Sequence, residues 1–244
     1  MTRGYGDFAA VYDELTRNVP YEEIAEYYVK ILGKTADVKR LLDMGCGTGN
    51  LTALLKKAGF DVVGVDGSSE MLSEAMAKAP DIFWVCQDMT ELDLGEEFDA
   101  VISTLDSINH LESITEIEQC FRRVNENLKP GGAFVFDVNT VYKHREILAD
   151  NTFVYDAEGA YCERLNEYSE EDNGVSIDLD IFFEQEDGSY IRGSESFREI
   201  AVEESELKEM LTKCGFEVVD IYEYLTFDKP RETSEKLLIC ARKK

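Results

Sequence analysis

Basic residues, paired cysteines, histidines and long apolar runs are all scarce in this chain, and each scarcity argues against a class of function. The 25 lysines and arginines face 51 aspartates and glutamates, which gives a formal charge of −26 at pH 7. Sequence-independent nucleic-acid binding relies on basic side chains that neutralise phosphates, so we do not expect a nucleic-acid partner. No run of about 18 apolar residues occurs, so we expect no membrane-spanning segment.

The six cysteines are spread along the chain, and no two of them form a Cys-x-x-Cys pair. The N-terminus lacks the apolar segment of a signal peptide, and cysteines of proteins in a reducing cytosol are usually free thiols. We therefore expect a cytoplasmic protein without disulfides. Because only two histidines are present, we expect no zinc site and assign no metal ligands.

Strand and helix patterns alternate through the first 140 residues. We expect strands at 40–44, 60–66, 82–86, 98–103 and 133–137, and helices at 21–32, 51–58, 68–79 and 114–127. Such alternation is typical of an α/β fold, in which helices cover both faces of a parallel sheet. Ligands of these sheets bind beyond the carboxyl ends of the strands, so polar residues that follow strands are the candidates for a site.

From about residue 150 the pattern becomes that of an antiparallel sheet. Apolar and polar residues alternate over 175–183, and Asn173-Gly174 and Asp187-Gly188 on either side are hairpin signals. We expect about three strands over 152–200, then a helix at 203–214 and strands at 216–224 and 236–241. The chain is accordingly divided into residues 1–149 (N-terminal lid helices and cofactor-binding core), 150–201 (inserted antiparallel lobe) and 202–244 (terminal helix and strand hairpin that complete the core sheet).

The most informative segment is the glycine loop, residues 43–50 (DMGCGTGN), which lies between the first strand and the next helix. Glycines let a backbone turn tightly beside a ligand, and the start of a helix favours an anionic group. Asp66 ends the following strand, where a carboxylate can bind both ribose hydroxyls. A dinucleotide loop would need glycine in place of Asn50, and Asp43 suits a ligand with an ammonium group. S-adenosylmethionine combines adenosine, a carboxylate and positive charge.

The glycine loop resembles motif I of the class I S-adenosylmethionine-dependent methyltransferases. Further segments match that family in order and spacing, at 63–72, 87–89, 98–102 and 128–132. The stretch from Tyr5 to Tyr21 is similar to a branch of small bacterial methyltransferases of unassigned substrate, and amino-sugar N-methyltransferases are looser relatives. The resemblance implies a Rossmann-like seven-stranded methyltransferase sheet with helices on both faces and an inserted antiparallel β-lobe.

The resemblance also implies which residues hold the cofactor. The glycine loop would bind the methionine end, the second strand's end the ribose and the third strand's end the adenine, while an N-terminal aromatic side chain closes over them. The candidates are Asp43, Gly45, Cys46, Gly47, Gly49, Asp66, Gly67, Asp88, Met89, Thr104 and Tyr12, with Tyr21 as a second choice for the aromatic lid.

Polar residues after the fourth and fifth strands are candidates for the acceptor site. In-line methyl transfer depends on positioning, and a base is needed only where the acceptor must first lose a proton. The candidate catalytic residues are Asp106, His110, Asp137 and Tyr12. The family's Asn-Pro-Pro-Tyr signature is absent after the fourth strand, which argues against methylation of DNA bases or glutamine.

We therefore expect an S-adenosylmethionine-dependent methyltransferase that acts on N or O of a small molecule, as a monomer or homodimer. The alternatives are an RNA or protein methyltransferase, an NAD-dependent oxidoreductase and a non-catalytic nucleoside-binding module. Basic residues in or near the lobe either receive an acidic acceptor such as a sugar nucleotide or pair with the lobe's own carboxylates. These residues are Lys143, Arg145, Arg164, Arg192 and Arg198.

Overall fold

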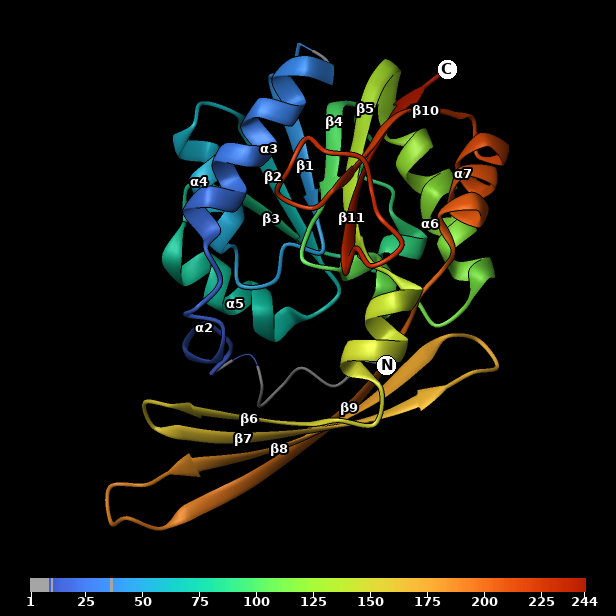
Figure 1. The fold of residues 1–244 in the computed structure, drawn as a ribbon. Helices are drawn as coiled ribbons and strands as arrows, with labels where there is room; N and C mark the ends of the chain where they lie inside the picture. The colour runs from blue at the N-terminus through green and yellow to red at the C-terminus, as the bar shows by residue number, and fades with distance from the viewer. Residues whose placement is uncertain (1–8, 10, 36) are drawn as a thin grey trace.

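The computed structural model describes residues 9, 11–35 and 37–244, which build a main sheet, helices on both of its faces and a second sheet below it (Figure 1). The main sheet has seven strands in the order β10-β11-β5-β4-β1-β2-β3. These strands are β1 (Arg40–Met44), β2 (Asp61–Asp66), β3 (Phe83–Cys86), β4 (Phe98–Ser103), β5 (Leu128–Asn139), β10 (Phe216–Glu223) and β11 (Lys236–Lys243). The expected α/β sheet is confirmed.

Strand pairing places a binding crevice at the ends of β1 and β4. β1 pairs in parallel with β2 on one side and with β4 on the other, so the strand order reverses at β1. Loops that leave a parallel sheet at such a reversal open a crevice beyond the carboxyl ends of the strands. β11 runs antiparallel to both β5 and β10, as the two closely spaced terminal strands predicted.

Helices pack on both faces of the main sheet. The α3 (Tyr21–Thr35) and α4 (Asn50–Lys57) helices cover one face, and α6 (Ile114–Glu126) and α7 (Glu204–Lys213) cover the other. The apolar stripe expected for α3 is confirmed, since Tyr28 and Leu32 are fully buried. The α5 helix (Ser69–Lys78) contacts β2 and β3, and the predicted N-cap Ser68 accepts a hydrogen bond from the Met71 N–H.

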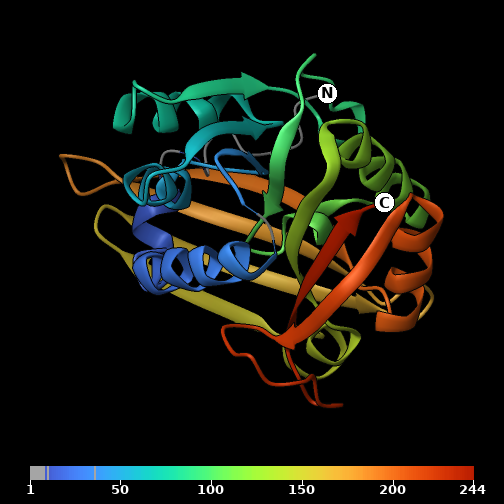
Figure 2. The ribbon, with the colours of Figure 1, turned by 90° about the horizontal axis from the view of Figure 1, so that it is seen from above.

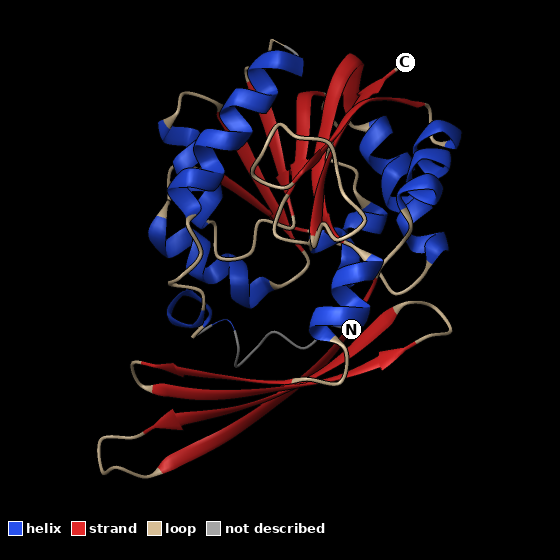
Figure 3. Ribbon diagram, viewed as in Figure 1, coloured by secondary structure: helices blue, strands red, loops and turns tan. Residues whose placement is uncertain are grey.

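The second sheet has four strands rather than the three expected. Its order is β6-β7-β8-β9, formed by β6 (Thr152–Ala157), β7 (Ala160–Ser169), β8 (Gly174–Glu184) and β9 (Tyr190–Ile200). All neighbours are antiparallel. β6 is short and precedes β7, from which a two-residue turn separates it, so its apolar alternation is weak in sequence. Figures 2 and 3 show this helix-free sheet passing beneath the main sheet.

Short helical turns connect the longer elements. They are α2 (Tyr12–Leu15), the 3-10 turns η1 (Met89–Glu91) and η2 (Ser107–His110), and the π-helical turn η3 (Lys143–Leu148). Segments of three to six residues carry too little periodicity to be predicted from sequence. No helix in the described part of the chain is long and apolar enough to cross a membrane. All six cysteines are free thiols, as expected.

Candidate active site

A cavity of about 840 Å³ lies where the loops after β1, β2, β3 and β4 face α2 and the second sheet. Most of the residues proposed from sequence line it. Those residues are Tyr12, Gly45, Cys46, Gly47, Asp66, Gly67, Asp88, Met89, Thr104, Asp106 and His110. Asp43, Gly49 and Asp137 are not among the lining residues, and the start of the stretch from Tyr5 to Tyr21 falls outside the described residues. Tyr21, the second choice for the aromatic lid, also lines the cavity.

Two glycines of the loop line the cavity with their backbone. Gly45 and Gly47 have positive φ angles of 76° and 54°, which side chains rarely adopt. A Cβ on Gly45 would lie 2.7 Å from the Cβ of Ser107, whereas one on Gly47 would meet no atom within 4 Å. Gly45 therefore lets the loops after β1 and β4 approach each other, and Gly47 leaves open space beside the cavity.

Gly49, which the sequence analysis proposed as a cofactor contact, has a packing role in the structure. A Cβ at this position would lie 2.5 Å from Cη2 of Trp84, and one on Gly64 would lie 2.3 Å from the same ring. The indole of Trp84 lies against both glycines, and its Nε1–H donates to the Ala79 carbonyl at 3.0 Å. Gly49 is thus required because Trp84 packs against the start of α4.

Asp43 lies behind the glycine loop, where it is almost completely buried. The Thr52 hydroxyl donates to its Oδ2 at 2.6 Å, but no group among the described residues hydrogen-bonds its Oδ1. Burial, with a contribution from the charge of Asp66, raises the pKa of Asp43 to about 7. A buried acceptor without a donor fits a ligand that carries an ammonium group, as S-adenosylmethionine does.

Carboxylates at the ends of β2 and β3 complete the cofactor half of the cavity. Asp66 accepts the Gly47 N–H at 2.8 Å and the Ser68 N–H at 2.9 Å, one on each oxygen. Each oxygen keeps a further lone pair for a ribose hydroxyl. Asp88 caps η1 by accepting the Thr90 N–H and hydroxyl on Oδ1, both at 2.8 Å. Both carboxylates are held rigidly with acceptor capacity left over.

Asp137 supports the turn after β4 through hydrogen bonds to its backbone. The amides of Leu105 and Asp106 donate to its two oxygens at 2.9 and 2.8 Å, and the Tyr28 hydroxyl adds a bond of 2.8 Å. Leu105 and Asp106 both have positive φ, 54° and 58°, so the turn is strained and needs such support. Asp137 is fully buried and is not among the cavity residues, so it supports this turn, whereas the sequence analysis placed it among the candidate catalytic residues.

Asp106 faces the cavity as a permanently charged carboxylate. Lys236 Nζ lies 2.7 Å from its Oδ1, and the Asn139 side-chain amide donates to its Oδ2 at 2.9 Å. Burial alone would raise the pKa of Asp106, but Lys236 and Lys143 outweigh it and hold that pKa well below its usual range. Asp106 therefore cannot exchange protons near neutral pH and acts as a fixed negative charge.

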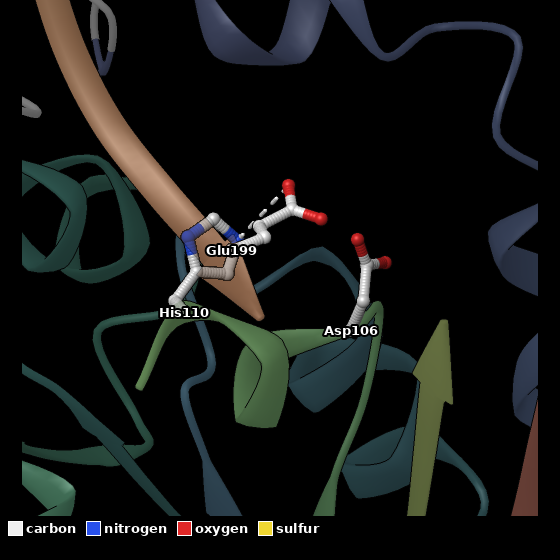
Figure 4. A group of neighbouring side chains, drawn as sticks. All are labelled: Asp106, His110 and Glu199. Atoms are coloured by element: carbon white, nitrogen blue, oxygen red, sulfur yellow. Dashed lines mark ion pairs between the residues drawn. The ribbon is translucent and has the colours of Figure 1, made fainter. Parts of the chain in front are cut away.

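Glu199 of β9 is a buried cavity residue that the sequence analysis missed. Its carboxylate lies 3.5 Å from His144 Nε2, 3.7 Å from the Arg164 guanidinium and 4.0 Å from His110 Nε2. Burial opposes ionisation, but these neighbours outweigh it and lower the pKa of Glu199. The His110 ring also packs on Phe197, with 5.2 Å between ring centroids. Figure 4 shows His110 and Asp106 from the β4 loop converging with Glu199.

Comparisons with known proteins identify the family. A family model described as a methyltransferase domain matches residues 41–132. A protein named as a methyltransferase in Geobacillus sp. (strain WCH70) is 38% identical over 98% of this chain and 99% of its own length. The chain belongs to the class I S-adenosylmethionine-dependent methyltransferases. Its cofactor is S-adenosylmethionine, and the oxidoreductase and binding-module alternatives are set aside.

Two further relatives of the methyltransferase are informative. The solved structure of an S-adenosylmethionine-dependent methyltransferase from Clostridium acetobutylicum ATCC 824 has a TM-score of 0.87 at 28% identity, with 98% of both chains covered. The dTDP-3-amino-3,4,6-trideoxy-alpha-D-glucopyranose N,N-dimethyltransferase of Streptomyces venezuelae is 32% identical over 54% of this chain and 56% of its own. The first similarity extends over the second sheet as well as the cofactor-binding core.

The N-terminal segment of the methyltransferase is fastened to its glycine loop by Asp13. This carboxylate accepts hydrogen bonds from the Thr48 hydroxyl at 2.6 Å and the Asn50 amide at 2.9 Å, and it pairs with Lys78 at 2.6 Å. The neighbouring Tyr12 is thereby placed in the cavity lining. The sequence analysis predicted the aromatic lid but not the residue that fastens it.

Proposed function

We propose that this methyltransferase transfers a methyl group to an amine nitrogen of a small molecule. The observation that carries the proposal is the pair of His110 and Glu199, which both line the cavity with 4.0 Å between Nε2 and the carboxylate. A histidine next to a carboxylate suits an acceptor that must lose a proton before it reacts. The amino-sugar dimethyltransferase among the relatives supports nitrogen as the methylated atom.

Nitrogen is favoured over oxygen by the strength of the available base. An alkylammonium proton titrates near pH 10, like that of lysine at about 10.4, and is acidic enough to pass to a histidine base. An aliphatic hydroxyl, close to water at about 15.7, needs a far stronger base or a metal ion. Asp106 does not serve as that base, because its charge is fixed by Lys236.

Each group of cavity residues would bind a different part of the cofactor or the acceptor. When bound, S-adenosylmethionine supplies an electrophilic methyl group and leaves as S-adenosylhomocysteine. Asp43 and the glycine loop would hold its methionine end, Asp66 the ribose, and Asp88 with Met89 the adenine. Tyr12 would cover the cofactor, and residues 150–201 would form the wall on which the acceptor rests.

His110 would take the proton from the acceptor at Nε2, the nitrogen that faces Glu199. The deprotonated amine would then have its lone pair free for the methyl group that the bound cofactor supplies. The Glu199 carboxylate stabilises the imidazolium, and His110 later returns the proton to solvent. His110 is therefore assigned as the base and Glu199 as the group that orients and charges it.

The test is methyl transfer to a panel of primary and secondary amines, with S-adenosylhomocysteine release and product mass as readouts. We expect amine-dependent turnover that rises with pH, and an H110A variant whose kcat falls at least tenfold while cofactor affinity stays within twofold. The matched control is Glu195→Gln, on the same strand as Glu199 but not among the cavity residues. Methylation of oxygen, or cofactor binding without transfer to any amine, would contradict the proposal.

A further inference from the structure

The acceptor half of the cavity combines an apolar floor with a few charged groups. Tyr155, Leu179 and Phe197 of the second sheet line it from below, and Leu15 and Val19 of the N-terminal segment line it from the other side. An acceptor that fits this space presents an apolar or aromatic body to these side chains, because burial of apolar surface on both sides drives its binding.

Three polar groups meet beside this apolar space at a spacing that suits an ammonium ion. One ligand atom each from Asp106, His110 and Glu199 lies within 4.8 Å of the other two (Figure 4). A point equidistant from three atoms spaced in this way is at most about 2.8 Å from each, which is within reach of N–H···O and N–H···N hydrogen bonds. The group therefore matches the three N–H donors of a primary ammonium.

The two lysines of this region lie behind the carboxylates and do not line the cavity. Lys236 Nζ is in contact with both Asp106 and Asp137, at 2.7 and 3.1 Å, and Lys143 donates to Asn139 at 2.9 Å. Neither lysine is among the cavity residues. An acceptor entering the cavity therefore meets the oxygens of Asp106 and Glu199 before it meets any lysine.

Arg164 is the only lysine or arginine among the described residues that line the cavity. Its guanidinium lies 3.7 Å from Glu199, and its Nε donates to the Asn166 side chain at 2.9 Å. A diphosphate brings about two negative charges and normally requires several basic side chains or helix N-termini. One arginine already facing a buried carboxylate does not provide such a site.

The remaining basic residues of the lobe are paired with acidic ones. Arg198 makes two bonds of 2.6 Å to Asp172, and Arg192 lies 2.6 Å from Asp180. Arg145 pairs with its neighbour Glu146 at 2.8 Å. Of the two roles that the sequence allowed for these side chains, the structure therefore favours pairing over reception of an acidic acceptor.

We propose that the acceptor of this methyltransferase is a phosphate-free primary amine on an apolar body, and that Asp106, His110 and Glu199 bind its ammonium group before deprotonation. This proposal rests on N-methylation as the proposed function and adds the acceptor class. The acceptor differs in kind from a nucleotide-linked amino sugar, the substrate named for the Streptomyces venezuelae relative.

The test is calorimetric binding to the protein loaded with S-adenosylhomocysteine, so that ammonium recognition is measured without turnover. The probes are tyramine, tyramine O-phosphate, phenethylamine and a thymidine-diphosphate amino sugar. We expect both phosphate-free amines to bind at least tenfold more tightly than either phosphorylated probe. Tighter or equal binding of a phosphorylated probe, or no binding of tyramine and phenethylamine at millimolar concentration, would overturn the proposal.

Variants locate the ammonium site. We expect Glu199→Gln and Asp106→Asn each to weaken phenethylamine binding at least tenfold, whereas Glu195→Gln on the same strand leaves it within twofold. Thermal unfolding and S-adenosylhomocysteine affinity show whether each variant is folded. Unchanged phenethylamine binding in both folded variants would refute the assigned site. Amine binding that persists without methyl transfer would instead count against the proposed function alone.

Discussion

Cofactor affinity should depend on pH through Asp43, because burial raises the pKa of its carboxyl to about 7. In the free protein this group is mostly protonated and neutral below pH 7. The positive charge of a cofactor bound at the glycine loop, in front of this buried carboxyl group, would favour the ionised carboxylate and lower its pKa. Cofactor binding then releases a proton, so affinity should increase as pH rises towards 7 and level off above it.

The size of the effect follows from the two pKa values. If the bound carboxyl returns to the ordinary aspartate value of about 4, affinity changes by about sevenfold per pH unit between about 5 and 7, or roughly 50-fold in all. At pH 6 each binding event should release roughly 0.9 proton. The window ends below about pH 7.5, where the α-amino group of the cofactor itself begins to titrate.

The assay is calorimetric titration with S-adenosylmethionine from pH 5 to 7 in buffers of different ionisation enthalpy. D43N should bind more weakly, show less than a twofold change over this range and release no proton. The control D61N, at the exposed first residue of β2, should retain the full dependence. A wild-type affinity that is flat with pH, or an unchanged slope in D43N, would refute this account of Asp43.

The free protein provides a second readout of the same group. Because the folded-state pKa of Asp43 is raised above its unfolded value, the folded state binds the extra proton between about pH 4 and 7. The contribution of Asp43 to stability is therefore fully present below about pH 4 and is lost as pH rises through 7. The difference in unfolding free energy between wild type and D43N, measured with urea, should follow that direction.

Other predictions concern the loop, the lid and the acceptor turn. Gly49→Ala should reduce the free energy of unfolding by about 2 to 4 kcal/mol, because the new Cβ would collide with Trp84 and the backbone there has positive φ. Gly47→Ala should reduce the free energy of unfolding by only about 1 to 2 kcal/mol, since the space there is open. It should weaken cofactor binding more than Gly49→Ala does. Equal unfolding costs in urea would contradict this reading. Asp13→Ala should accelerate cofactor dissociation roughly tenfold in stopped-flow fluorescence with little loss of secondary structure, and an unchanged rate would show that the lid is held by other contacts. Asp137→Asn should lower kcat at least tenfold with cofactor affinity within twofold, because the turn carrying Asp106 loses its support; unchanged kcat would remove Asp137 from its positioning role.

Local sequence was sufficient for the cofactor half of the site. The glycine loop, the carboxylate that ends β2 and the N-cap Ser68 are each contiguous with the elements they terminate. Their geometry follows from backbone sterics and hydrogen bonds between near neighbours, which a short segment encodes. The same reasoning located most strands and longer helices, and failed for β6 and the short turns.

Tertiary structure decided the acceptor half. Glu199 of the second sheet lies close to His110 and to Arg164. Both Glu199 and Arg164 are more than 50 residues from His110 in sequence, so no local sequence pattern predicts the group. Trp84 explains Gly49 only once β3 is packed beside the glycine loop. The composition determines the net negative charge of the chain. Which charges face the cavity depends on the burial of Lys236 behind Asp106 and on the pairing of the lobe arginines with carboxylates. These relations depend on long-range packing, in which each contact is set by the whole fold rather than by its neighbours in sequence.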